Sequence, residues 1–487
     1  MRVVLLAYVV LAVLYALVTP AWQAPDEPAH YNYVVHVAEQ GGLPELRPGD
    51  YPAEYLEQIK AARFPPDLSI APIRYESHQP PLYYLVASVI YGLGEALLPL
   101  EGYLTLRLFS VVIGALALIL AYRLVSALYP DEPAVAVGAA AFWATLPMHL
   151  SMTSAVNNDV LAELLVTFIV LKLVSMRAGD WSNRRAIGLG AALGLALLTK
   201  FQSYAAFGVA AAALLYDVWT TRRTPGRLAW GRALQYGGLM LATALLVASP
   251  WIVRNVTLYG LRDPFGLVRH AEVVTGQPTT AGYIAQHGWL GWLRAYAVTT
   301  FHSFWGQFGW MGVPLPTNVY VALGVLSGLS GLGLVAYALR VRRGAEALSA
   351  GTRRGLVLLA VWAAMALAGY LWWNTQYVQH QGRYLFPALP ALATAFALGL
   401  RETVRQGRRL GLGALGLAAA ALVVSGMLRG DVYVFGVALL AAAAALVLVG
   451  HWVEQRRPGW ALGAAYGGLA LFAAACLFIY LAPALAL

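Results

Sequence analysis

Two adjacent carboxylates, Asp26 and Glu27, stand between prolines directly after the first apolar segment of the chain. Acidic side chains are costly to keep at a membrane boundary, and in a partly dehydrated cavity such a carboxylate can act as a general base. Pro28 also favours a helix start here, where Asp26 would cap the first turn. The two roles are compatible, and we predict Asp26 as a catalytic base with Glu27 beside it.

Three further residues of the same region are candidates for orienting this acid or contacting an acceptor: His30, Glu76 and His78. His30 follows Asp26 by four positions, which places both on one face of a helix. The same spacing supplies half of a metal site, whose other donors would have to come from farther along, for example from Asp159. We expect that no metal is required.

Acidic residues also open a later apolar segment. Asp159 ends an Asn-Asn-Asp run and would cap the helix that follows, and Glu163 lies one turn farther along. An ionisable residue at the mouth of a span or within it is a functional candidate by default. We therefore add Asp159 to the orienting or acceptor-binding residues and keep Glu163 as a candidate.

Three basic residues lie at the ends of apolar segments on the side where positive charge is otherwise sparse: Lys200, Arg254 and Arg383. Basic side chains gathered at one interface favour an anionic ligand such as a phosphate. Each of them alone would also be explained by snorkelling to lipid headgroups. As a group they predict a phosphate-binding site.

Aromatic residues accompany these charges at the same boundary. Two tyrosines follow a double proline, two tryptophans stand in a Gly-rich aromatic run, and one tyrosine follows Arg383. Such rings can stack on sugar faces or hold an acyl chain, and they are equally typical of an interfacial aromatic belt. The candidates for sugar or lipid contact are Tyr83, Tyr84, Trp305, Trp310 and Tyr384.

The composition sets the class of protein that must position these groups. Of 487 residues, 60% are hydrophobic and 11% are charged, and the mean hydropathy is +0.64. Soluble proteins have roughly 45–50% apolar and roughly 25% charged residues. The composition therefore excludes a soluble protein and predicts an all-α polytopic membrane protein. The single cysteine, Cys476, can form no disulfide within the chain.

Apolar runs of span length indicate about thirteen transmembrane helices. We place them at residues 3–21, 103–128, 134–152, 160–176, 186–199, 202–218, 233–252, 317–339, 355–372, 384–400, 410–428, 432–450 and 461–483. The first run would alternatively be a cleaved signal peptide, but its apolar stretch is long for one. We expect it to be a helix.

Short loops rich in arginine alternate along the chain with loops that carry few positive charges. This asymmetry predicts a cytoplasmic N-terminus and an external C-terminus, and it makes the net charge of +10 an orientation signal with no nucleic-acid partner implied. Two large loops, at about residues 22–102 and about 253–316, then fall outside. We expect the first loop to be helical. We also expect the chain to divide into a catalytic module at 1–400 and further transmembrane helices at 401–487.

These motifs together resemble the GT-C superfamily of membrane glycosyltransferases, especially protein O-mannosyltransferases and lipid A aminoarabinose transferases, and a related uncharacterised bacterial membrane-protein family. The resemblance covers most of the chain and is carried by Pro25 to His30, His78 to Tyr84, Asn158-Asp159, Thr199-Lys200, Arg254-Asn255 and Gln381 to Tyr384.

The resemblance implies transfer of a sugar, with inversion, from a polyprenyl-phosphate donor to a hydroxyl of a glycan, lipid or protein. Asp26 would be the base, and the site would face the outside of a bacterial inner membrane. We expect neither the β-trefoil insertion of the mannosyltransferases nor a soluble C-terminal domain of the kind found in oligosaccharyltransferases. Peptide recognition is therefore not expected.

Three alternatives remain open at this point. A lipid-linked glycan polymerase or ligase would use outer arginines on a pyrophosphate donor and need no carboxylate base. A transporter or flippase of lipid-linked sugars would carry ionisable residues near the middle of its spans, whereas here nearly all lie at helix ends. An inactive relative serving as a scaffold would retain the same motifs.

Overall fold

The computed structural model describes the chain except for residues 223–227, 411–412, 414, 431–432 and 487, and it is almost wholly helical. The first helix, α1, runs Arg2–Val18 and packs in the core, where Tyr15 donates a hydrogen bond to the carbonyl of Ala473, 2.9 Å away. Its Tyr8, Ala12, Tyr15 and Ala16 are buried among other helices, so the predicted helix is present and packed.

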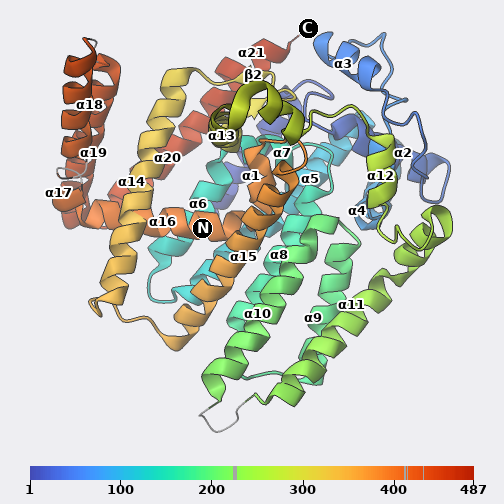
Figure 1. Cartoon of the computed structure of the whole chain (residues 1–487), viewed down its shortest axis with the longest axis horizontal. Coiled ribbons are helices and arrows are strands. Elements are labelled where there is room, and N and C mark those ends of the chain that lie inside the picture. The colour runs from blue at the N-terminus through green and yellow to red at the C-terminus, as the bar shows by residue number, and fades with distance from the viewer. Residues whose placement is uncertain (223–227, 411–412, 414, 431–432, 487) are drawn as a thin grey trace.

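The predicted first outer loop is helical, as expected. It contains α2 (Glu27–Glu39), α3 (Ala53–Ala61), the 3₁₀ helix η1 (Tyr75–His78) and α4 (Leu82–Leu97). The second contains α12 (Leu267–Val273), α13 (Thr280–Trp305) and a two-stranded antiparallel ribbon of β1 (Gln307–Phe308) and β2 (Val313–Pro314). Figure 1 shows α2, α3, α12 and β2 at one end of the bundle, opposite the connection between α14 and α15.

The remaining helices form the bundle. They are α5 (Gly102–Leu128), α6 (Pro133–Thr145), α7 (Pro147–Thr153), α8 (Asp159–Ser175), α9 (Asn183–Leu197), η2 (Phe201–Ser203), α10 (Tyr204–Thr221), α11 (Trp230–Tyr259), α14 (Thr317–Arg342), α15 (Ala350–Asn374), η3 (Gly382–Ala388), α16 (Leu389–Arg405), α17 (Gly407–Leu410), α18 (Gly416–Arg429), α19 (Val434–Arg456), α20 (Trp460–Ala475), the π-helix η5 (Cys476–Leu481) and α21 (Ala482–Leu485). The all-α polytopic fold is thus confirmed.

The span predicted at 134–152 is not one straight helix. It divides into α6 and α7, which are bent by 68° at Leu146. The cause is Pro147, which lacks an N–H group and holds the preceding residue in an extended conformation. The loop after α7 contacts the first residue of α2, since the backbone N–H of Val156 donates to Glu27.

Eight helices in the described part of the chain are long and apolar enough to cross a membrane, and nine if the bent pair counts as one span. The helices α1, α8 and α9 are shorter, at 17, 17 and 15 residues. The span predicted at 410–428 lies partly outside the described residues. The number thirteen stays a prediction.

Candidate active site

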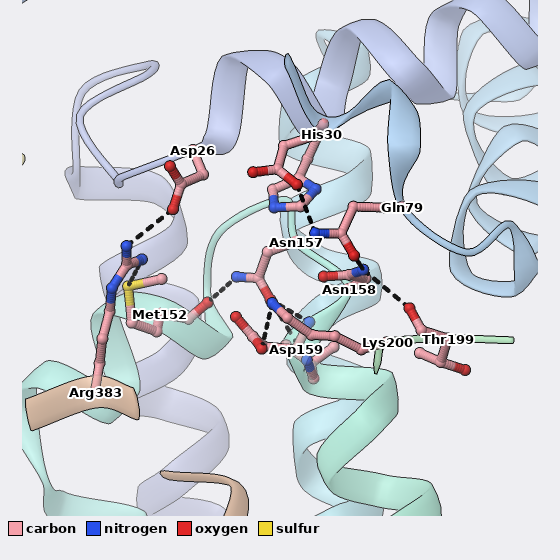
Figure 2. Close-up of polar contacts among 12 residues, drawn as sticks. Asp26, His30, Gln79, Met152, Asn157, Asn158, Asp159, Thr199, Lys200 and Arg383 are labelled. Atoms are coloured by element: carbon pink, nitrogen blue, oxygen red, sulfur yellow. Dashed lines mark hydrogen bonds and ion pairs between the residues drawn. The ribbon is translucent and has the colours of Figure 1, made fainter. Parts of the chain in front are cut away.

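Asp26 directly precedes α2. Its carboxylate points toward η3, a helix that lies far from α2 in the sequence. Its Oδ2 accepts a hydrogen bond from Arg383, 2.9 Å away, and its Oδ1 accepts one from the hydroxyl of Tyr75 at 2.8 Å. Figure 2 shows the contact between Asp26 and Arg383. The carboxylate does not cap α2, so the capping role predicted for it is wrong. It is available to the site instead.

The backbone of Asp26 has φ = 69°, a left-handed conformation that costs a non-glycine residue about 1–2 kcal/mol. The next residue, Glu27, is held by hydrogen bonds from Trp22, Arg107 and Val156. Strain of this kind persists only where neighbouring structure fixes it, and it is found often at functional sites.

Glu27 is fully buried and contacts a different arginine from Asp26. Its two carboxylate oxygens accept hydrogen bonds from Nε and Nη2 of Arg107 at 2.7 and 2.6 Å. They also accept hydrogen bonds from the backbone N–H groups of Trp22 and Val156. The guanidinium of Arg107 donates further to carbonyls at the end of α1. Glu27 therefore links the segment after α1, helix α5 and the loop before α8.

Sequence reasoning missed Arg107. The available signal was an arginine inside the apolar run at 103–128, since a buried charge within a span needs a partner. That partner is Glu27, which the sequence had suggested as part of the reactive pair.

A second ion pair lies in the same region. Lys200, in the link before η2, contacts Oδ1 of Asp159 through its Nζ at 2.7 Å. Asp159 begins α8 without capping it; Asn157 does so, since its side-chain oxygen accepts from the N–H groups of Asp159 and Val160. The amide of Asn158 donates to the carbonyl of Thr199, as Figure 2 shows, and so fixes Lys200 beside α8.

Gln79, which sequence reasoning passed over, connects the first outer loop to this pair. Its Nε2 donates to Glu76 at 2.7 Å, and its Oε1 accepts from Asn158 at 3.2 Å. His30 lies beside them and shares a 2.7 Å hydrogen bond with the hydroxyl of Tyr84. His78 instead packs against His270 of α12 in a tilted arrangement, with ring centroids 4.2 Å apart, and so joins the two outer loops.

The charges around Asp26 decide its protonation state. Burial would raise the pKa of Asp26, but the positive charge of Arg383, together with the hydrogen bonds from Arg383 and Tyr75, holds that pKa below the usual carboxyl value. Burial lowers the pKa of His30, which outweighs the opposing effect of Glu76. Near neutral pH the site thus holds an ionised carboxylate beside a neutral imidazole.

The structure does not gather all three predicted phosphate ligands. Arg254 donates to the carbonyls of Leu43 and Pro44 and to the side chain of Asn255, so it anchors the first outer loop to α11. Its expected role was inferred from its place at a helix end, which does not tell where the side chain points. Lys200 and Arg383 remain as the cations of the site.

The aromatic candidates also divide. Trp305 is 2% exposed and packs on Phe142, so it belongs to the core. Tyr83 and Tyr84 are fully buried, and Tyr84 supports His30. Tyr384 adjoins Arg383, whose guanidinium lies 5.4 Å from its ring centre.

Trp310 donates its indole N–H to the carbonyl of Trp22, four residues before Asp26. Trp310 therefore joins the second outer loop to the segment that precedes Asp26.

Glu163 lies deeper and pairs with His149 of α7 at 2.9 Å. Within the described part of the chain, no three His, Cys, Asp or Glu side chains are grouped so that they could hold a metal ion. The site itself holds two ion pairs, Asp26 with Arg383 and Asp159 with Lys200.

Known proteins resemble this chain in sequence and in fold. The chain is 27% identical over 394 residues to undecaprenyl phosphate-alpha-4-amino-4-deoxy-L-arabinose arabinosyl transferase of Pseudomonas aeruginosa strain UCBPP-PA14. The matched region covers 78% of this chain and 60% of the relative. The Pseudomonas paraeruginosa protein of the same name is 32% identical over 176 residues, covering 35% of this chain and 29% of its own length. The chain thus spans about three fifths of the first of these relatives.

Among solved structures, ArnT from Cupriavidus metallidurans bound to undecaprenyl phosphate matches with a TM-score of 0.55 and 16% identity, covering 98% of this chain and 76% of that one. Its apo form matches with a TM-score of 0.53. The expected GT-C fold is thereby confirmed. The family described as "Predicted membrane protein (DUF2142)" matches residues 69–392. The chain belongs to this DUF2142 family of membrane proteins.

Proposed function

We propose that this chain transfers a sugar from a polyprenyl-phosphate donor to an acceptor hydroxyl, with residues 1–400 carrying the chemistry and 401–487 adding supporting helices. The observation that carries the proposal is the carboxylate of Asp26 held beside Arg383, with Lys200 nearby, in a chain that shares the fold of a protein solved with undecaprenyl phosphate. The arabinosyl transferases of Pseudomonas are its relatives in sequence.

The proposed step is a single displacement. Each carboxylate oxygen of Asp26 keeps a lone pair after its one hydrogen bond, so Asp26 can accept the proton of the acceptor hydroxyl. The acceptor oxygen then bonds to the anomeric carbon while the bond from that carbon to the phosphate oxygen breaks, which inverts the anomeric centre. The phosphate leaves as a stable anion, and positive charge from Lys200 and Arg383 stabilises it.

The two cations are already paired with Asp159 and Asp26. A donor phosphate would therefore share them with these carboxylates. His30 and Glu76 would orient the acceptor or the acid, and Tyr384 and Trp310 would contact the sugar or the lipid. Glu27 would act by positioning Asp26. We place the protein in a bacterial inner membrane with the N-terminus inside and the C-terminus and the site outside.

The proposal is tested with the purified full chain, a panel of labelled polyprenyl-monophosphate sugars and an extract of envelope lipids and glycans as acceptor. We expect release of polyprenyl phosphate together with transfer of the label. Turnover of a polyprenyl-pyrophosphate sugar alone would favour the polymerase or ligase alternative. Binding of donors without cleavage of any of them would contradict an enzyme of this kind and favour a flippase or scaffold.

Replacing Lys200 should weaken binding of the donor phosphate. We expect Lys200→Gln to raise the Kd for undecaprenyl phosphate about 10-fold, because a charge-assisted contact contributes roughly 1.5–3 kcal/mol and Asp159 keeps part of it neutralised. The matched control is Lys60→Gln, which removes another outer lysine that is paired with Glu57. Equal affinities of the two variants would remove Lys200 from the phosphate site.

The hydroxyl of Tyr75 should lower the pH at which kcat/KM falls on the acid side of its pH profile. A base must be ionised to work, so the rate falls when pH drops below the pKa of Asp26, which Tyr75 and Arg383 lower. Tyr75→Phe removes one hydrogen bond to the ionised form, and we expect the acid limb of kcat/KM to move upward by about one pH unit. Tyr51→Phe, which alters a ring packed on Tyr75, is the control. An unmoved limb would mean that Asp26 is not the titrating group.

A further inference from the structure

A second basic site lies away from the candidate active site, in a cavity between α14, α16, α17 and α19. The cavity has a volume of about 550 Å³, within the usual range for ligand sites. Six basic side chains line it: Arg340, Arg343, Arg405, Arg408, Arg409 and His451. Figure 1 shows α17 and α19 at the left edge of the bundle, apart from α2, α4 and α12.

Acidic residues neutralise only part of this charge. Arg340 pairs with Glu402 and Glu346, and Arg405 lies 3.7 Å from Glu132. The other three arginines of the cavity have exposed side chains, and no ion pair is formed by them within the described residues: Arg343, Arg408 and Arg409. An excess of positive charge therefore faces the cavity.

The floor of the cavity is fixed by close packing. A Cβ on Gly407 would come within 2.5 Å of the Cβ of His451, so glycine is what lets α17 approach α19. His451 in turn donates from Nδ1 to the carbonyl of Val404 at 2.9 Å, and its Nε2 accepts from Gln455. Both ring nitrogens are thus engaged, and the arginines remain to bind a ligand.

One wall of the cavity is apolar. Ala336 and Leu339 of α14 line it, and Leu332 and Val335 continue the same exposed face one to two turns back along that helix. In a membrane-spanning helix such a face contacts acyl chains. The cavity therefore adjoins lipid as well as water, which favours an amphiphile over a free anion.

We propose that this cavity binds the phosphate headgroup of an anionic phospholipid, with arginines 343, 408 and 409 on the phosphate and the acyl chains along Leu332, Val335 and Leu339. The bidentate geometry of arginine suits a phosphate diester, and basic pockets between helices on the cytoplasmic side are suited to such headgroups. This proposal is independent of the catalytic one.

The test counts lipids bound to the purified full chain by native mass spectrometry, with phosphatidylglycerol and phosphatidylcholine of identical acyl chains and with inorganic phosphate as a third probe. We expect phosphatidylglycerol to bind at least 10-fold more tightly than phosphatidylcholine. The triple variant Arg343→Gln, Arg408→Gln, Arg409→Gln should weaken phosphatidylglycerol binding about 100-fold, at roughly a factor of five for each arginine. The corresponding triple lysine variant should retain part of the affinity.

The matched control removes three exposed arginines of the same predicted cytoplasmic side that lie outside the cavity: Arg177→Gln, Arg184→Gln and Arg353→Gln. Its phosphatidylglycerol affinity should stay within about twofold of the parent chain. Equal losses in the two triple variants would overturn the proposal, as would equal binding of the two lipids, or phosphate binding that phosphatidylglycerol does not displace. Thermal unfolding in a zwitterionic detergent checks that both variants are folded.

Discussion

Asp26→Asn is expected to lower kcat for sugar transfer by about 10³-fold while leaving the Kd for undecaprenyl phosphate within about threefold of the parent value. The amide cannot take a proton from the acceptor, but its oxygen can still accept the hydrogen bond from Tyr75. The effect should therefore appear in the rate rather than in donor binding. Steady-state kinetics and equilibrium binding measure the two quantities separately.

The control for this variant is Asp67→Asn, which changes an exposed acidic residue of the same outer loop. Its kcat should equal that of the parent chain. An Asp26→Asn variant that keeps more than a tenth of the parent kcat would make Asp26 a structural partner of Arg383 and leave the base unassigned.

Glu27→Gln should have the largest effect on stability. The substitution leaves Arg107 buried beside a neutral side chain, and breaking a buried ion pair in this way costs about 3–5 kcal/mol of the free energy of unfolding. The loss should also release the strained backbone of Asp26, so activity falls along with stability. Unfolding in mixed micelles of increasing SDS fraction measures the change.

The control for Glu27→Gln is Glu45→Gln, because Glu45 forms an ion pair with Arg47, whose side chain is 70% exposed. Glu45→Gln should cost less than about 1 kcal/mol, since exposed ion pairs contribute little. If Glu27→Gln were no more destabilising than Glu45→Gln, Arg107 would not depend on Glu27, and the positioning role assigned to Glu27 would be lost.

The sequence could predict the fold class and the segments of the site because these depend on local signals. Apolar runs mark the helices, and prolines mark the start of α2 and the head of α4. Spacing could not tell which way neighbouring side chains point: Asp26 faces Arg383, 357 residues away, whereas Glu27 faces Arg107. The left-handed backbone at Asp26 separates the two carboxylates. No sequence pattern predicts this backbone conformation.

Side-chain direction also explains the other differences. Lys200 and Arg254 both stand at helix ends, yet one reaches Asp159 and the other reaches the carbonyls of the first outer loop. Trp305 and Trp310 belong to one aromatic run, but Trp305 lies in the core at the end of α13 and Trp310 lies in the turn between β1 and β2. The sequence predicts that such residues lie at the membrane boundary. Tertiary packing alone decides which of their side chains reach the candidate active site.

The central claim is that Asp26 activates an acceptor against a polyprenyl-phosphate sugar. The most direct measurement is single-turnover transfer of labelled sugar, with donor bound to saturation, by the parent chain and by Asp26→Asn in parallel. We predict that the parent chain releases polyprenyl phosphate and sugar product in equal amounts and that the variant, equally loaded with donor, does so about 10³-fold more slowly. Equal single-turnover rates in the two proteins would contradict the claim.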